Sequence, residues 1–85
     1  MENSRIELYG TEWCLKSTAL RNFMQSKWIE FDDFNVETDE EAREKVMALY
    51  DGKLKFPTLI YKGEHLKNPT SKELSEFLKE KGVDL

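Results

Sequence analysis

The residue best suited to chemistry in this chain is Cys14, the only cysteine among 85 residues. It stands between a segment typical of a strand and a segment typical of a helix. A helix start presents unpaired backbone N–H groups and the positive end of the helix dipole, which both favour a thiolate. Such surroundings lower a cysteine pKa from about 8.5 into a range of about 3.5–7.5, and the thiolate is the form that attacks disulfides. The sequence therefore predicts a reactive, exposed thiol, and the alternative is a small buried hydrophobe.

Ser17 lies three positions after Cys14, where a two-cysteine redox motif carries its second sulfur. Any redox chemistry must therefore proceed with one sulfur, because serine cannot resolve a mixed disulfide. Ser17 is either an inert replacement with a local hydrogen bond in the helix or a donor that keeps the Cys14 thiolate ionised. Lys16 is either an ordinary solvated lysine or a cation that favours the thiolate, whereas Glu12 would oppose it.

The composition limits the class of protein. A chain of 85 residues makes one domain, over residues 1–85. One cysteine excludes an internal disulfide scaffold and a zinc site with four cysteine ligands. The net charge of −4, from 17 acidic and 13 basic residues, argues against a nucleic-acid partner, since such proteins carry a basic stripe. A free thiol, a start unlike a signal peptide and no long apolar run predict a cytoplasmic protein without a membrane span.

The elements that must position Cys14 follow from hydrophobic periodicity. Alternating apolar and polar residues predict strands at 5–9, 31–36, 58–61 and 64–67. A helix is predicted from Cys14 to about Lys27. Its apolar stripe comprises Leu15, Ala19, Leu20, Phe23, Met24 and Trp28. The first four residues are polar, and we expect a frayed end there.

Two further helices are predicted to open with a capping box, in which a threonine and a glutamate three residues later bind each other's backbone N–H groups. Thr38 and Glu41 begin the first, which stops at 51–52, and Thr70 and Glu73 begin the last. Their buried faces are predicted to hold Ala42, Val46, Leu49, Tyr50, Leu74, Phe77 and Leu78.

The predicted order is strand, helix, strand, helix, strand, strand, helix. Strands joined by a helical crossover pair in parallel, and the late hairpin adds antiparallel strands, so a mixed α/β sheet with helices on both faces is expected. The acidic run 37–44 is interpreted as a cap and a solvated helix face, and His65 as a solvated strand residue. Aromatic residues predicted to belong to the core are Trp28, Phe31, Phe34 and Phe77.

This order resembles the thioredoxin fold, and within it the short glutaredoxin-like proteins, particularly the mycoredoxin branch. Three stretches carry the resemblance, at 9–14 (Tyr-Gly-Thr-Glu-Trp-Cys), 56–59 (Phe-Pro-Thr-Leu) and 68–70 (Asn-Pro-Thr). The likeness extends from about Ser4 to Gly82. It implies a small four-stranded mixed sheet flanked by three helices, in the order βαβαββα.

The resemblance also implies roles for individual residues. Cys14 would be the catalytic nucleophile, and the Phe56–Pro57 bond would be cis, leaving the Phe56 backbone free to pair with an extended substrate. The stretch 68–71 occupies the place where relatives hold the carboxylate of a glutathione adduct, and a helix N-terminus there could receive an anion. The implied substrate or thiol-binding residues are Trp13, Phe56, Pro57, Thr58, Thr70 and Ser71.

The chain departs from the family pattern at its motif. Ser17 replaces the second cysteine of the dithiol form. Monothiol relatives that carry iron–sulfur clusters have Gly-Phe where this chain has Leu15-Lys16, and a lysine shortly before the motif where it has Thr11-Glu12. The residues therefore do not support cluster binding, although two protomers and two external thiolates could in principle supply four sulfurs. No other metal site is expected.

The leading hypothesis is a monothiol glutaredoxin-like thiol-disulfide oxidoreductase. The Cys14 thiolate would attack a mixed disulfide between a protein and a low-molecular-weight thiol, and a second small thiol would regenerate it. This predicts no bound cofactor, with glutathione or another small thiol as co-substrate, and a monomer that acts on thiolated or disulfide-bearing proteins. The alternative is a redox-silent binding module that captures a peptide or thiol ligand in a groove at Trp13 and Pro57.

Overall fold

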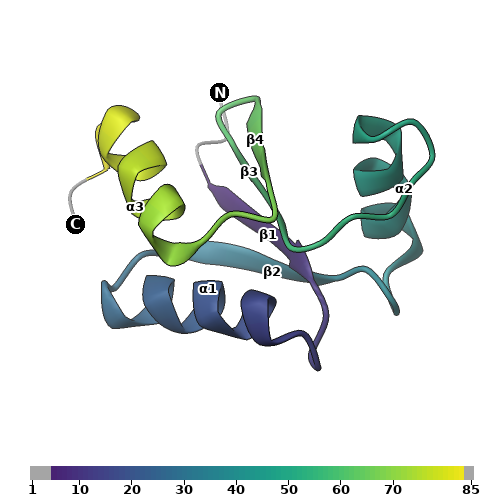
Figure 1. Cartoon of the computed structure of the whole chain (residues 1–85), viewed down its shortest axis with the longest axis horizontal. Coiled ribbons are helices and arrows are strands. Elements are labelled where there is room, and N and C mark those ends of the chain that lie inside the picture. The colour runs from purple at the N-terminus through teal and green to yellow at the C-terminus, as the bar shows by residue number, and fades with distance from the viewer. Residues whose placement is uncertain (1–4, 84–85) are drawn as a thin grey trace.

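The computed structural model describes residues 5–83, so the predicted frayed end at residues 1–4 lies outside the described residues. The elements follow the predicted order, and their boundaries agree closely with the prediction (Figure 1). They are β1 (Ile6–Gly10), α1 (Leu15–Ser26), β2 (Phe31–Asn35), α2 (Glu40–Leu49), β3 (Thr58–Tyr61), β4 (Glu64–Lys67) and α3 (Ser71–Glu80).

The four strands form one mixed sheet in the order β2-β1-β3-β4. β1 pairs in parallel with β2 and antiparallel with β3, and β3 pairs antiparallel with β4. Helices α1 and α3 cover one face of the sheet, and α2 covers the other (Figure 1). This is the predicted fold, a small four-stranded sheet flanked by three helices.

Each face of the sheet has its own core, because successive strand residues point to opposite faces. In β1, Leu8 packs toward α1 and α3, whereas Tyr9 packs toward α2. The larger core holds Ile6, Leu8, Leu20, Met24, Leu59, Tyr61, Leu74, Phe77 and Leu78. The smaller core holds Tyr9, Val36, Ala42 and Val46, with Phe34, Tyr50, Phe56 and Ile60 packed against it. Burial of these side chains is the main force that holds the helices on the sheet.

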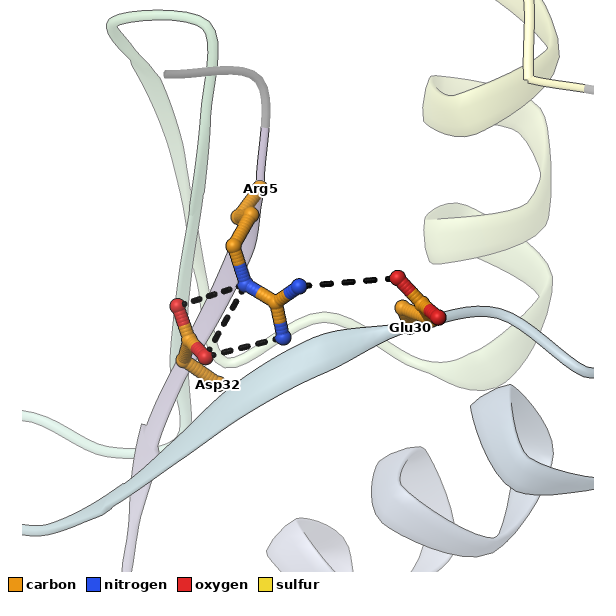
Figure 2. Close-up of polar contacts among 3 residues, drawn as sticks. All are labelled: Arg5, Glu30 and Asp32. Carbon is orange, nitrogen blue, oxygen red and sulfur yellow. Dashed lines mark hydrogen bonds and ion pairs between the residues drawn. The ribbon is translucent and has the colours of Figure 1, made fainter.

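Two aspartates in β2 have arginine partners, which explains how such poor strand formers are tolerated there. Arg5 Nε donates to both carboxylate oxygens of Asp32 at 3.0 Å, and a second Arg5 nitrogen lies 3.5 Å from Glu30 (Figure 2). On the neighbouring residue, Arg21 Nε donates to Asp33 at 2.6 Å. These pairs connect β2 to the start of β1 and to α1, at the edge of the sheet.

All three helices end with the 6→1 hydrogen bond of a Schellman motif and a left-handed residue just past the cap, and α1 and α3 also make its 5→2 bond. The left-handed positions are Trp28 (φ 58°), Asp51 (φ 54°) and Gly82 (φ 84°). In α1 the Ile29 N–H donates to the Met24 carbonyl at 2.9 Å, and both side chains join the larger core. The chain therefore turns back to the sheet at Ile29, one residue beyond Trp28.

Three predictions about the apolar stripe of α1 are wrong. Trp28 is 93% exposed, because the helical period on which its burial was predicted has already ended. Leu15 is 85% exposed, since at 100° per residue it lies across the helix from the face of Ser17 and Met24. Ala19 is exposed for the same reason. The other predicted core aromatics, Phe31, Phe34 and Phe77, are half-buried or buried.

The predicted start of α2 is also corrected. Its N-cap is Asp39, whose side chain accepts from the Ala42 N–H at 3.1 Å, and not Thr38. The reason is a turn after β2, in which the Asn35 carbonyl accepts from the N–H groups of both Thr38 and Asp39, at 3.2 and 2.8 Å. Thr38 therefore belongs to this turn, and the helix begins one residue later than the sequence motif predicts. Leu49, predicted to be buried, is 37% exposed.

Candidate active site

Cys14 is the N-cap residue of α1, at the corner between β1 and the helix. Its backbone is extended, its side chain is half-buried, and the thiol makes no capping hydrogen bond. The Cys14 N–H donates to Thr11 Oγ1 at 3.2 Å, and the Cys14 carbonyl accepts from the Thr18 N–H at 3.0 Å. These bonds hold the backbone of the corner, while the N–H groups of the first helical turn stay available to the sulfur.

The surroundings lower the pKa of Cys14 below its ordinary value. Partial burial raises the pKa of the thiol, but this effect is outweighed by stabilisation of the thiolate by the Ser17 hydroxyl, the Ser17 and Lys16 N–H groups and the Lys16 charge. The thiolate sulfur thus takes the place of the oxygen that normally caps a helix. Glu12, predicted to oppose ionisation, is exposed and is not among the groups that shift this pKa.

Ser17 is fully buried against the end of β1. Its Oγ has no hydrogen-bond partner within residues 5–83. A Cβ placed on Gly10 would lie 2.2 Å from this oxygen, so the close approach requires glycine at that position. A buried hydroxyl without a partner is costly. It is therefore poised to donate to the Cys14 thiolate.

Trp13 and Phe56 form an apolar wall beside Cys14. Their rings meet edge to face, with centroids 5.7 Å apart, and Trp13 is 64% exposed. The Trp13 Nε1 donates to Glu37 Oε1 at 2.8 Å, which fixes the orientation of the indole. The contact brings the cysteine corner beside the loop that enters β3.

Pro57 follows Phe56 through a cis peptide bond, as the resemblance implied. The Pro57 carbonyl accepts from the Asn68 N–H at 2.7 Å, which sets the turn before α3 beside this proline. Thr58, by contrast, is fully buried. Its Oγ1 lies 3.0 Å from the Tyr50 hydroxyl and donates to the Lys55 carbonyl at 2.9 Å. The Thr58 side chain therefore supports the loop from within and is not open to a ligand.

The predicted capping box at the start of α3 is confirmed. Thr70 Oγ1 accepts from the Glu73 N–H at 3.1 Å, and Glu73 Oε1 accepts from the Thr70 N–H at 2.8 Å. The Thr70 hydroxyl is thus engaged within its own helix, and Ser71 is the first residue of α3. In the part of the chain that the structure describes, no hydrogen bond joins either residue to Cys14.

Three supporting residues were missed at the level of sequence: Gly10, Thr11 and Glu37. Thr11 could have been found, because a threonine three residues before the N-cap often accepts a local backbone hydrogen bond. Gly10 was interpreted only as a strand end. The sequence predicts that Glu37 belongs to a cap and a solvated helix face, yet it precedes α2 and orients Trp13. Its partner lies 24 positions away in sequence, so no local pattern indicates it.

The described residues also bear on metal binding, membrane spans and the single histidine. Within residues 5–83, no three His, Cys, Asp or Glu side chains gather in a way that could hold a metal ion. In the same range, no helix is both long and apolar enough to cross a membrane. His65 is exposed on β4, where its ring meets that of Tyr50.

Solved structures share this fold. The thioredoxin-like protein BC3987 matches with a TM-score of 0.77 at 24% identity, over 87% of this chain and 100% of that one. The glutaredoxin-like NrdH-redoxin from Escherichia coli matches with a TM-score of 0.72 at 22% identity, over 85% of this chain and 92% of that one. At these identities the similarity concerns the fold.

Sequence comparisons show the family. The chain is 35% identical over 72 residues to Mycoredoxin 1 of Corynebacterium glutamicum. The aligned region spans 84% of this chain and 89% of that protein. The glutaredoxin family model matches residues 6–66, which include Cys14, Phe56 and Pro57. The chain therefore belongs to the glutaredoxin family, a family of thiol-disulfide oxidoreductases.

Proposed function

We propose that the chain reduces mixed disulfides between proteins and a low-molecular-weight thiol by a monothiol route through Cys14. The Cys14 thiolate attacks the sulfur of the small thiol, forms a new disulfide with it, and releases the protein cysteine as a thiolate that takes up a proton. A second small thiol, as thiolate, then attacks this disulfide. It regenerates the Cys14 thiolate and leaves as the oxidised small-thiol dimer, so the two small thiols supply both electrons.

One observation carries this proposal: the sulfur of Cys14 lies at the N-cap position of α1, a helix start without a side-chain capping hydrogen bond. The free N–H groups and the buried Ser17 hydroxyl have nothing else to bind there, and they stabilise the thiolate. The same features keep the thiolate a good leaving group for the second step. Ser17 supplies no second sulfur, so regeneration must come from an external thiol.

In this proposal the exposed wall of Trp13 and Phe56 guides the substrate chain to the sulfur. The Phe56 backbone precedes the first paired residue of β3, so it is free to pair with an extended peptide. Glutathione or another small thiol serves as co-substrate, and the protein works as a monomer in the cytoplasm. Thr70 and Ser71 contribute through the N-terminus of α3, which favours an anion.

The first test measures the rate of Cys14 alkylation by iodoacetamide against pH. We expect a midpoint below the ordinary thiol value of about 8.5. The matched control is the double variant Cys14→Ser/Gln25→Cys, which moves the only thiol to an exposed site in the last turn of the same helix. Its midpoint should be ordinary or higher, because a helix C-terminus disfavours an anion.

The second test measures turnover of a glutathionylated peptide, with glutathione in excess as the reductant. Wild type should release the peptide thiol catalytically, and mass spectrometry should detect glutathione on Cys14. Cys14→Ser should do neither. An ordinary midpoint together with no turnover, for glutathione and for other small thiols, would overturn the proposal and favour a redox-silent peptide-binding module.

A further inference from the structure

A hollow of about 350 Å³ lies beside the loop that carries the cis-proline. It is lined by Leu54, Lys55, Phe56, Lys67 and Asn68. Phe56 is shared with the active site, because its ring also meets that of Trp13. A group bound in the hollow would therefore sit next to the substrate wall beside Cys14.

The two lysines that line this hollow have no carboxylate partner in the structure. Lys55 and Lys67 are exposed, and neither forms an ion pair with any residue between 5 and 83. Five of the 13 lysines and arginines form ion pairs within residues 5–83, namely Arg5, Arg21, Arg43, Lys45 and Lys81, and Lys55 and Lys67 are the two of the other eight that line the hollow. In a chain of net charge −4, two unpaired lysines at one hollow make a local site for an anion.

The Trp13 side of the active site carries two carboxylates, while the Lys16 charge acts on the Cys14 sulfur at the corner. Glu12 lies beside Trp13 in the cysteine corner, and Glu37 binds the Trp13 indole. A negatively charged substrate segment is therefore repelled on the Trp13 side and attracted on the Lys55 and Lys67 side. This difference in charge favours one orientation of a charged substrate chain along the wall of Trp13 and Phe56.

Exposed apolar side chains indicate that the partner is a polypeptide. Trp13, Leu15 (85% exposed) and Leu54 (37% exposed) lie around the cysteine corner and the hollow. Large exposed hydrophobic side chains rimmed by charge mark protein-binding surfaces, whereas a small thiol would need only part of this area.

We propose that this hollow is a specificity subsite for an acidic side chain of the protein substrate, close in sequence to the cysteine that carries the mixed disulfide. The subsite rests on the proposed function, because it selects substrates for the Cys14 reaction. Lys55 and Lys67 bind the carboxylate through exposed ion pairs, and Phe56 and Leu54 contact the aliphatic part of the chain.

The test uses synthetic peptides with one cysteine held in a mixed disulfide with 2-mercaptoethanol, which carries no charge. One peptide set has aspartate at each position near the cysteine in turn, and the matched set has asparagine. We expect the best aspartate peptide to exceed its asparagine twin in kcat/KM by about three- to tenfold, the effect of one or two exposed ion pairs. Raising the salt concentration should reduce this ratio.

Lysine variants then locate the effect. Lys55→Gln/Lys67→Gln should bring the aspartate-to-asparagine ratio close to one. Lys27→Gln is the matched control, because Lys27 is an exposed lysine at the other end of α1, and it should keep the wild-type ratio. A reversed pair, Lys67→Glu with a lysine-bearing peptide, should restore selectivity with the opposite sign. A ratio that the lysine variants leave unchanged would overturn the subsite.

Two further arms separate the alternatives. In the first, the asparagine peptide carries glutathione instead of 2-mercaptoethanol in its mixed disulfide. If Lys55 and Lys67 raise kcat/KM only for the glutathione-capped peptide and not for the aspartate peptide, the subsite binds the small thiol and the proposal is overturned. In the second, Cys14→Ser binds reduced peptides without reaction, followed by NMR at Phe56 and Lys67. Lysine-dependent binding there without turnover by wild type would leave the subsite standing while the proposed oxidoreductase function fails.

Discussion

The last residue of β1, Gly10, touches the third residue of α1, Ser17, across the corner that carries Cys14. A Cβ atom on Gly10 would lie 2.2 Å from Ser17 Oγ and 2.8 Å from Ser17 Cβ. This contact buries Ser17 completely and sets the distance between the strand end and the helix start. The geometry of the reactive thiol therefore depends on the absence of a side chain at Gly10.

We predict that Gly10→Ala destabilises the protein by about 1–3 kcal/mol, because the added methyl group overpacks this contact. Denaturant unfolding measures the change in the free energy of unfolding. The double variant Gly10→Ala/Ser17→Ala should lose less than the sum of the two single variants, since removal of the hydroxyl relieves the shorter clash. Strict additivity would show that the two residues do not share this contact.

The ionisation of Cys14 should make stability depend on pH. Burial raises the pKa of this thiol, but the Ser17 hydroxyl and the free N–H groups outweigh it, so the pKa in the folded protein lies below that of the unfolded chain. The contribution is therefore fully present above the unfolded value of about 8.5 and is lost as the pH falls through the folded value. Unfolding free energies measured from mildly acidic to alkaline pH should rise across this window.

Two variants isolate that contribution. Cys14→Ser should remove the rise, because no group remains to ionise there. Ser17→Ala should shrink it by raising the folded pKa, and at acidic pH it should stabilise the protein by about 1 kcal/mol, because a buried hydroxyl without a partner is gone. If Cys14→Ser shows the same rise in the free energy of unfolding with pH as wild type, the rise comes from the ionisation of another group.

The fold was predictable because each element carries its own signal, and so was the position of Cys14. Helical and strand periods gave the seven elements, and the Thr70–Glu73 capping box placed α3. Cys14 lies at a corner between two clear elements, so its place at a helix start followed from local sequence. These features depend on neighbours along the chain.

What could not be predicted depends on contacts between distant segments. The burial of Ser17 is decided by Gly10, and the orientation of Trp13 by Glu37. The exposure of Leu15 depends on which face of α1 packs against the sheet. The apolar character of Leu15, the first residue of the helix, does not indicate which face this is. The hydroxyl of Thr58 lies in the interior because it contacts the Tyr50 hydroxyl, just after α2, and donates to the Lys55 carbonyl in the loop before β3.

Trp28 provides a test of backbone strain at a helix end. It occupies the left-handed position of the α1 Schellman motif, which favours glycine, and its side chain is 93% exposed. Trp28→Gly should therefore raise the free energy of unfolding by about 1 kcal/mol. Gly82→Ala, at the equivalent position after α3 (φ 84°), should lower it by a similar amount. A loss of stability in Trp28→Gly would show that the indole makes a contribution that its exposure hides.

The start of α2 separates the structural cap from the one expected from the sequence motif. Asp39→Ala should cost about 1 kcal/mol, because it removes the acceptor of the Ala42 N–H. Thr38→Ala should cost much less, since the Thr38 side chain does not cap the helix. Thermal or denaturant unfolding distinguishes the two, and the reverse ranking would restore Thr38 as the cap.

A second sulfur at position 17 should convert the monothiol site into a dithiol site. Ser17 is the third residue of α1 and Cys14 is its N-cap, the two positions that approach each other in a capping interaction. In Ser17→Cys the new thiol can therefore attack a mixed disulfide on Cys14, and the variant should reduce ordinary peptide disulfides faster than wild type. The oxidised variant should also contain an internal disulfide, seen in its mass as the loss of two hydrogen atoms. The matched control is Thr18→Cys, whose thiol is one residue further around the helix and should give neither result. Equal behaviour of the two variants would mean that the sulfur of Cys14 does not face position 17, which would contradict the stabilisation of its thiolate by Ser17.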